Sequence, residues 1–226
     1  MSKLFKRAIQ VCIASVLLSV LWVWTYAYLN PPISMYMLHQ YFTEDSGVDF
    51  EWQDIEKISP EIPMAFIASE DQLFLEHSGF DLNAIEKAIQ HNQKHKNTRG
   101  ASTISQQVAK NLFLVPSRSY VRKGFEAYFT ALIELLWSKK RIMEVYLNIV
   151  EMGKGVYGVP RATEIYFNLD PNQVGRSQAA LLAVALPNPK VYSLERPSSY
   201  MYNRSRWVMR QMSNLGGAGI LKDWYE

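Results

Sequence analysis

The feature that most constrains this chain is a long uncharged apolar segment close to its N-terminus. The segment AIQVCIASVLLSVLWVWTYAYL runs from Ala8 to Leu29 without a charged residue. A membrane-spanning helix needs roughly 20 mainly apolar residues, and this segment supplies them. The alternative is a cleaved signal peptide, whose apolar region is typically about 7–15 residues long and ends at small residues. Because this segment is longer and ends in bulky aromatic residues, it predicts an uncleaved anchor.

The residues on either side of the segment predict its orientation. Lys3, Lys6 and Arg7 precede it, and the positive-inside rule keeps such residues in the cytoplasm. Tryptophan and tyrosine gather at the far end, as in the aromatic belt of a membrane surface. We therefore expect three regions: a cytoplasmic tip and transmembrane anchor over 1–29, a membrane-proximal segment over 30–58, and an exported domain over 59–226.

The exported region has the patterns of a mainly α-helical domain. Phe125, Phe129, Leu132 and Leu136 recur at the spacing of one helix face, and Asp81 is the expected N-cap of the helix that begins there. No sustained alternating pattern predicts a strand, and we interpret MGKGVYG at 152–158 as a loop. The expected helices cover 81–90, 103–114, 117–137, 141–150, 160–167, 176–186 and 198–214.

Charge is distributed unevenly along the chain. The formal net charge is only +3, which gives no general reason to expect a nucleic-acid partner. A span from Lys87 to Phe125 nevertheless contains no Asp or Glu, and acidic residues stand on both sides of it. This sorting favours a site for an anion, with anionic lipid headgroups as the alternative ligand. The basic residues of the span are Lys87, Lys94, Lys96, Arg99, Lys110, Arg118, Arg122 and Lys123.

Within that span, RGASTISQQVAKN predicts a polar helix face. Thr103, Gln107 and Lys110 fall at i, i+4 and i+7, with Gln106 and Asn111 beside them. Hydroxyls and amides both donate and accept hydrogen bonds while lysine meets negative charge, so the face suits a sugar-phosphate ligand. The alternative is a solvated face, but such faces are usually rich in Glu and Lys.

Three stretches contain candidate carboxylates and cations. In RSYVRKGFE, Arg118, Arg122 and Glu126 share one side of a helix; an exposed ion pair there would be worth only about 0.3–0.5 kcal/mol. In FIASEDQLFLEHSGFD, Glu70 and Asp71 are either an acidic pair on a wet helix face or a catalytic acid in a partly dry cleft. The single cysteine, Cys12, allows no intramolecular disulfide and no cysteine-based zinc site.

Four motifs together resemble the family 51 glycosyltransferases, the peptidoglycan glycosyltransferases that polymerise lipid II. EDQLFLEHSGFD, GASTISQQVAKN, RKGFE and KKRIMEVYLN stand in the family's order and spacing, and the resemblance covers most of residues 60–190. No S-x-x-K or K-T-G motif is present, so the chain is similar to the monofunctional, membrane-anchored form. The resemblance implies a mainly α, lysozyme-like domain on a single N-terminal transmembrane helix.

The resemblance also implies roles for individual residues. Glu70 matches the general base and Glu126 the second essential carboxylate, while Asp71 would hold local geometry or a nearby cation. Cations would stabilise the pyrophosphate leaving group. The implied substrate-binding residues are Lys110, Arg118, Lys123, Arg122, Ser102, Thr103, Gln106, Gln107 and Asn111. We expect the base and the cations to meet across a single groove at the lipid boundary.

The implied reaction is an inverting transfer from a polyprenyl-pyrophosphate-linked glycan chain to the 4-hydroxyl of lipid II. It would take place on the periplasmic side of the bacterial inner membrane. The implied partners are lipid II, the growing chain and membrane lipid, while other cell-wall synthesis proteins stay open and no nucleic acid is expected. No metal site is expected in the sequence and no cofactor is certain, although a divalent cation remains open.

Two other functions compete with this interpretation. A lysozyme-like enzyme could use the same acidic pair to cleave glycan, although its substrate would not require a basic span free of acids. A non-catalytic, membrane-anchored cell-wall scaffold would tolerate replacement of Glu70. Both alternatives are separated from the transferase by its requirement for a lipid-linked substrate.

Overall fold

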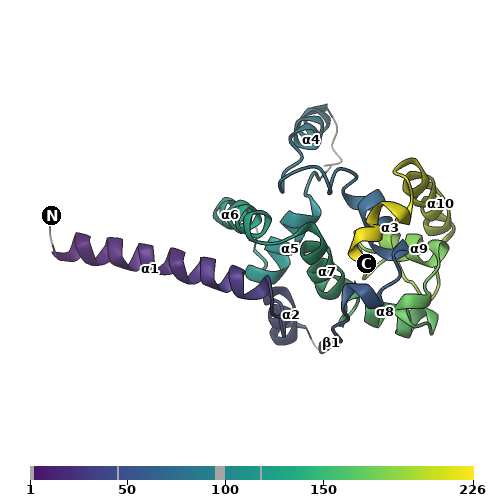
Figure 1. The fold of residues 1–226 in the computed structure, drawn as a ribbon, viewed down its shortest axis with the longest axis horizontal. Coiled ribbons are helices and arrows are strands. Elements are labelled where there is room, and N and C mark those ends of the chain that lie inside the picture. The colour runs from purple at the N-terminus through teal and green to yellow at the C-terminus, as the bar shows by residue number, and fades with distance from the viewer. Residues whose placement is uncertain (1–2, 45, 95–99, 118) are drawn as a thin grey trace.

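The computed structural model describes residues 3–44, 46–94, 100–117 and 119–226, which form a mainly helical body with one long projecting helix (Figure 1). The helices and strands are α1 Lys3–Tyr26, α2 Met35–Thr43, β1 Asp49–Phe50, η1 Ile55–Lys57, α3 Glu61–Glu70, α4 Leu82–Lys94, α5 Ile104–Phe113, α6 Tyr120–Leu136, α7 Lys139–Ile149, β2 Glu151–Gly153, β3 Val156–Tyr157, α8 Val159–Phe167, η2 Pro171–Gln173, α9 Arg176–Ala185, α10 Ser199–Asn214 and η3 Ala218–Trp224.

Helix α1 has the length and composition of the expected membrane anchor. Among the described residues it is the one helix long and apolar enough to cross a bilayer, and almost none of its apolar window is buried. The C-terminal half of α1 packs on the body, where the Trp22 ring lies 5.1 Å from Phe113 and 6.3 Å from Phe129. The Trp137 Nε1 atom also donates a hydrogen bond of 2.8 Å to the Val23 carbonyl. The projecting part is therefore free to enter a membrane (Figure 1).

Helix α3 runs through the core of the body. Helices α9 and α10 pack against it, and α5 packs against α6 and α7 nearby. Every residue from Ile62 to Ala68 is buried. A helix covered on all sides needs no polar face, so its sequence carries no 3.6-residue pattern. Helix α3 was absent from the expected helices for this reason, and it ends at Glu70.

The helices expected from sequence patterns are confirmed, and so is the expected N-cap at Asp81. The Asp81 carboxylate accepts a hydrogen bond of 2.8 Å from the Ala84 backbone and starts α4. The Ser198 hydroxyl does the same for Met201 at 3.3 Å and starts α10. Helix α10 ends before Gly216 and Gly217, whose positive φ angles of 97° and 71° favour glycine.

The expectation of no strands was wrong. A small sheet has the order β1-β3-β2, with β3 parallel to β1 and antiparallel to β2. The segment 152–158, interpreted as a loop, contains the end of β2 and all of β3. Strands of two or three residues are too short to show alternation, so the sequence pattern could not reveal them.

The membrane-proximal segment contributes to both the core and the surface. Met37 and Ile55 are fully buried, whereas Tyr41 and Phe42 are 59% and 76% exposed. Strand β1 joins this segment to the body by pairing Asp49 with Val156. The domain boundary between residues 58 and 59 stays a prediction.

Candidate active site

Glu70 is the last residue of α3 and faces a cavity. Its carboxylate accepts a hydrogen bond of 3.2 Å from Gln107 Nε2 and a longer one of 3.4 Å from the Ser69 hydroxyl. Burial raises the pKa of Glu70 above its ordinary value. The hydrogen bonds from Gln107 and Ser69 and the positive charge of Arg204 oppose that rise in pKa. The result is a carboxylate with few water contacts and increased affinity for a proton.

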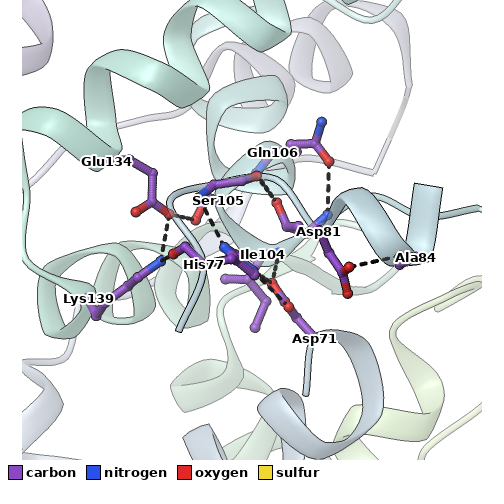
Figure 2. A network of polar contacts seen from close by, with 11 residues as sticks. Asp71, His77, Asp81, Ala84, Ile104, Ser105, Gln106, Glu134 and Lys139 are labelled. Carbon is purple, nitrogen blue, oxygen red and sulfur yellow. Dashed lines mark hydrogen bonds and ion pairs between the residues drawn. The ribbon is translucent and has the colours of Figure 1, made fainter. Parts of the chain in front are cut away.

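Asp71 has a different environment and a structural task. It is buried and accepts hydrogen bonds of 2.9 Å from both His77 Nε2 and the Ile104 backbone, as Figure 2 shows. His77 Nδ1 in turn accepts a hydrogen bond of 3.0 Å from the Gly79 backbone. Asp71 thus holds the first turn of α5 in place, which is the local role expected for it, and His77 is a hydrogen-bonded packing residue.

A second set of polar contacts supports the same region (Figure 2). Lys139 Nζ lies 2.8 Å from Glu134 Oε1 and donates to the His77 carbonyl at 2.6 Å. Glu134 also accepts a hydrogen bond from the Ser105 hydroxyl on α5. These contacts join α5, α6 and α7 to the loop that follows Glu70.

The cavity at Glu70 has a volume of about 1060 Å³. Its walls come from the end of α3, the start of α5, α4 and α10. The lining side chains used here are Glu70, Glu76, Asp81, Lys87, Ser102, Thr103, Gln107, Arg204, Trp207 and Gln211. A cavity of this size accommodates a sugar unit or more.

Sequence reasoning missed the α10 wall of this cavity. Arg204, Trp207 and Gln211 follow the i, i+3, i+7 spacing of one helix face, and the Arg204 guanidinium lies 3.7 Å from the centre of the Trp207 ring. The spacing was visible in the sequence, but it does not show which cavity the face lines. Arg204 is a cation facing Glu70 that lies outside the acid-free span.

The predicted polar face of α5 separates into distinct roles. Thr103 and Gln106 form a capping box, in which each side chain bonds the backbone N–H of the other. Gln107 bonds Glu70, and Ser102 lines the same cavity. Asn111 is half-buried and is not among the lining residues of the cavities described here. Gln106 therefore builds the helix start, and Gln107 is the residue of the face that touches Glu70.

Two of the predicted cations line a second, smaller cavity of about 340 Å³. Lys110 and Arg122 face it together with Tyr36 and Ser117. Lys110 stays exposed at the cavity mouth although protein surrounds much of its side chain. This partial burial lowers the pKa of Lys110; the negative charge of Glu126 opposes the shift, and neighbouring cations add to it.

Glu126 is buried beneath these cations. It lies 2.8 Å from Arg122 Nη1 and also pairs with Lys123 Nζ, whose side chain is 50% exposed. Glu126 is 2% exposed and lines none of the cavities described here. Its geometry is that of a residue that orients cations. Arg118, the remaining predicted cation, lies outside the described residues.

The expected single groove is not what the described residues form. Glu70 lines one cavity and Lys110 lines another. Helix α5 connects them, because Gln107 faces the first cavity and Lys110, one turn later, faces the second. Within the described ranges, no group of three or more His, Cys, Asp or Glu side chains is placed to hold a metal ion. The requirement for a divalent cation stays a prediction.

Comparisons with known proteins are consistent with this arrangement. A family model described as Transglycosylase matches residues 37–213. Curated proteins named biosynthetic peptidoglycan transglycosylase are similar along most of the chain. One from Shewanella oneidensis is 48% identical, covering 90% of this chain and 89% of its own. Others from Pseudomonas putida and Xylella fastidiosa are 46% and 44% identical, covering 98% and 96% of this chain and 96% and 92% of their own.

Proposed function

The chain is a member of the transglycosylase family, and from this premise we propose that Glu70 is the general base of glycan polymerisation. The protein is a peptidoglycan glycosyltransferase. Its donor is a glycan chain on a polyprenyl pyrophosphate, and its acceptor is lipid II. In the proposed step the acceptor 4-hydroxyl gives its proton to Glu70 as its oxygen attacks the anomeric carbon of the donor. The pyrophosphate leaves from the opposite side, which inverts that carbon.

The surroundings of Glu70 support this role. A general base works best when its pKa lies close to the working pH. Burial moves the pKa of Glu70 in that direction, while Gln107 and Arg204 keep an ionised form accessible. Gln107 leaves one oxygen of the carboxylate without an amide donor, and Ser69 approaches that oxygen only at 3.4 Å. That oxygen is the one we assign to the acceptor hydroxyl.

The basic cluster supports the other half of the reaction. Lys110, Arg122 and Lys123 carry three positive charges against the single negative charge of Glu126, which leaves the four groups at +2. A departing pyrophosphate gains negative charge in the transition state, and prearranged cations stabilise it. Glu126 holds Arg122 and Lys123 in position through its two oxygens. We assign Arg118 to this cluster from its sequence motif alone.

The observation that carries the proposal is the position of α5 between the two cavities. Gln107 bonds Glu70 on one side, and Lys110 faces the second cavity about 4.5 Å further along the helix axis. We place the acceptor in the larger cavity and the donor pyrophosphate in the smaller one. Ser102, Thr103 and the α10 wall would then contact the acceptor sugar.

The anchor fits a substrate that stays in the bilayer. Polyprenyl-linked sugars do not leave the membrane, so an enzyme that joins them must work at its surface. The N-terminal basic residues favour a cytoplasmic tip and a catalytic domain on the periplasmic side of the inner membrane. Helix α1 then holds both cavities close to the lipid headgroups.

Polymerisation of labelled lipid II by purified protein tests the role of Glu70. We expect Glu70→Gln to lower kcat by at least about 100-fold, because general base catalysis contributes roughly 10²–10⁴-fold. Glu76→Gln is the matched control, since Glu76 lines the same cavity but is exposed. It should retain activity within about threefold of wild type, and binding of lipid II should survive in both variants.

The same assay separates the competing functions. A Glu70→Gln protein that polymerises at the wild-type rate would exclude the proposed base and favour a scaffold. Shortening of glycan in isolated sacculi, without lipid II, would favour the hydrolytic alternative. The basic cavity argues against hydrolysis, because a glycan substrate has no pyrophosphate for Lys110 and Arg122 to meet.

A further inference from the structure

We propose that Tyr146 is a positioning residue whose hydroxyl orients the Gln107 amide toward Glu70 and lets that amide follow the protonation of the base. The proposal rests on the role assigned to Glu70 above. It concerns α7, whose KKRIMEVYLN motif has no other assigned function here. Tyr146 does not touch substrate, and it acts only through Gln107.

Three side chains from three helices form a continuous hydrogen-bonded line. Tyr146 Oη of α7 donates to Gln107 Oε1 at 3.3 Å, and Gln107 Nε2 of α5 donates to Glu70 Oε2 at 3.2 Å. Tyr146 is fully buried, and its ring packs edge-on against Phe66 of α3 with a centroid separation of 5.8 Å. The hydroxyl is therefore held in place by the core, while Glu70 faces the cavity.

An amide between two such groups has only one orientation that suits an ionised base. With the NH₂ group toward Glu70, the amide stabilises the carboxylate. In the reversed orientation the Gln107 carbonyl oxygen would face the carboxylate and repel it. The charge of Glu70 therefore selects the favourable orientation, and the Tyr146 hydroxyl holds it by donating its O–H group to the carbonyl oxygen that points away from Glu70.

The same three groups also satisfy the protonated base. After Glu70 has accepted a proton, its O–H group can donate to Gln107 Oε1 once the amide has reversed. The Gln107 NH₂ group then donates to the Tyr146 oxygen, since a phenol both donates and accepts. The transferred proton stays on Glu70 throughout. Burial and the charges of Glu70 and Asp71 raise the pKa of Tyr146 well above its ordinary value, which keeps its own proton in place.

Other ionisable groups face Glu70 but do not take part in this line. Arg204 of α10 approaches it from across the cavity, and Asp71 follows it in the chain. The loop after α3 adds Glu76, and the start of α4 adds Asp81 and Lys87 to the lining. These charges are the same in wild type and in a variant that lacks only the Tyr146 hydroxyl. They therefore do not contribute to a difference between the pH profiles of the two proteins.

The test is the pH dependence of kcat/KM for lipid II polymerisation by Tyr146→Phe. We expect the acid limb of the profile to move to higher pH, because the ionised base loses an oriented donor. The loss of activity should be about 3- to 10-fold on the acid side, the value of one hydrogen bond, and smaller at alkaline pH. Tyr225→Phe is the matched control, because the buried Tyr225 hydroxyl has no hydrogen-bond partner in the part of the chain that the structure describes.

A double-mutant cycle separates positioning from a general packing effect. In a Gln107→Met background there is no amide to orient, so Tyr146→Phe should have no further effect on the profile. Gln107→Met alone should also raise the acid limb, which preserves the test if Tyr146→Phe does not fold. An unchanged profile in either single variant, or effects that simply add, would overturn the proposal. Full activity of Glu70→Gln would instead reject the base itself.

Discussion

Glu70 and Asp71 are consecutive in the chain but lie in different environments because α3 ends between them. Glu70 has the last helical backbone conformation, while Asp71 is the C-cap with φ −157° and ψ 76°. The turn directs one carboxylate into the cavity and the other under the first turn of α5. The sequence identified the pair as important and, through the family resemblance, assigned their roles. It could not show how the backbone separates them.

A stability measurement distinguishes these two carboxylates. Between the ordinary glutamate pKa of 4.5 and the raised pKa of native Glu70, the folded protein binds more protons than the unfolded chain. Stability therefore falls as the pH rises through that window. We expect Glu70→Gln to have a higher Tm than wild type at pH 7, with a difference that shrinks as the pH falls to 4.5.

The matched comparison for that measurement is Asp71→Asn. An amide cannot accept from both His77 and the Ile104 backbone through two charged oxygens, so this variant should lose about 1.5–3 kcal/mol of stability. Its Tm should fall at pH 7 while that of Glu70→Gln rises. A Tm increase for Glu70→Gln that grows toward acid pH would contradict the burial argument.

At the scale of elements, sequence patterns succeeded where a helix has one apolar face. Helices α6, α7 and α10 were predicted because a polar side faces solvent and leaves a 3.6-residue period. Helix α3 was missed because it is covered all round, and β1 to β3 were missed because they are so short. The α5 motif predicted a substrate-binding face, which stays a prediction, and two residues of that face, Thr103 and Gln106, form the capping box of the helix.

Helix α6 contains a glycine that its local structure does not require. Gly124 is exposed in the middle of the helix, and a Cβ atom added there would meet nothing within 4 Å. Gly in a helix interior costs roughly 0.5–1 kcal/mol relative to Ala. Gly124→Ala should therefore raise the free energy of unfolding by about that amount, measured by denaturant titration in detergent.

A second glycine supplies the contrast for this prediction. At Gly153 in β2, an added Cβ would collide with the Tyr166 hydroxyl. Gly153→Ala should therefore lower the free energy of unfolding, whereas Gly124→Ala should raise it. If Gly124→Ala instead destabilises the protein, then the backbone of α6 at that position makes a close contact with the anchor or with lipid. A Cβ atom would prevent that contact.

At the scale of the whole molecule, the anchor is joined to the catalytic body by side chains at its exit. Arg141 donates to the Tyr26 carbonyl at 3.0 Å, to the Leu29 carbonyl at 2.7 Å and to Asn30 Oδ1 at 3.0 Å. These bonds satisfy carbonyls at the end of α1 that have no helical partner. The C-terminal end of α1 is thus a fixed part of the fold.

Arg141→Ala should loosen that connection. We expect proteolysis between residues 27 and 34 to become faster, because charge-assisted hydrogen bonds worth about 1.5–3 kcal/mol each are lost. Polymerisation in liposomes should fall severalfold while membrane localisation is kept. Lys140→Ala is the control, since Lys140 pairs with the exposed Glu56 and such a pair is worth about 0–1 kcal/mol. Equal cleavage of the two variants would show that α1 is held by its apolar contacts alone.

The most direct test of the central claim is the pH dependence of kcat/KM for wild-type polymerisation of lipid II. Only ionised Glu70 can accept the acceptor proton, so activity should fall tenfold per pH unit below the pKa of the base. Burial raises the pKa of Glu70, and the acid limb should therefore lie above the ordinary glutamate value of 4.5. A profile that stays flat to pH 4.5, or breaks below it, would contradict a buried carboxylate as the proton acceptor.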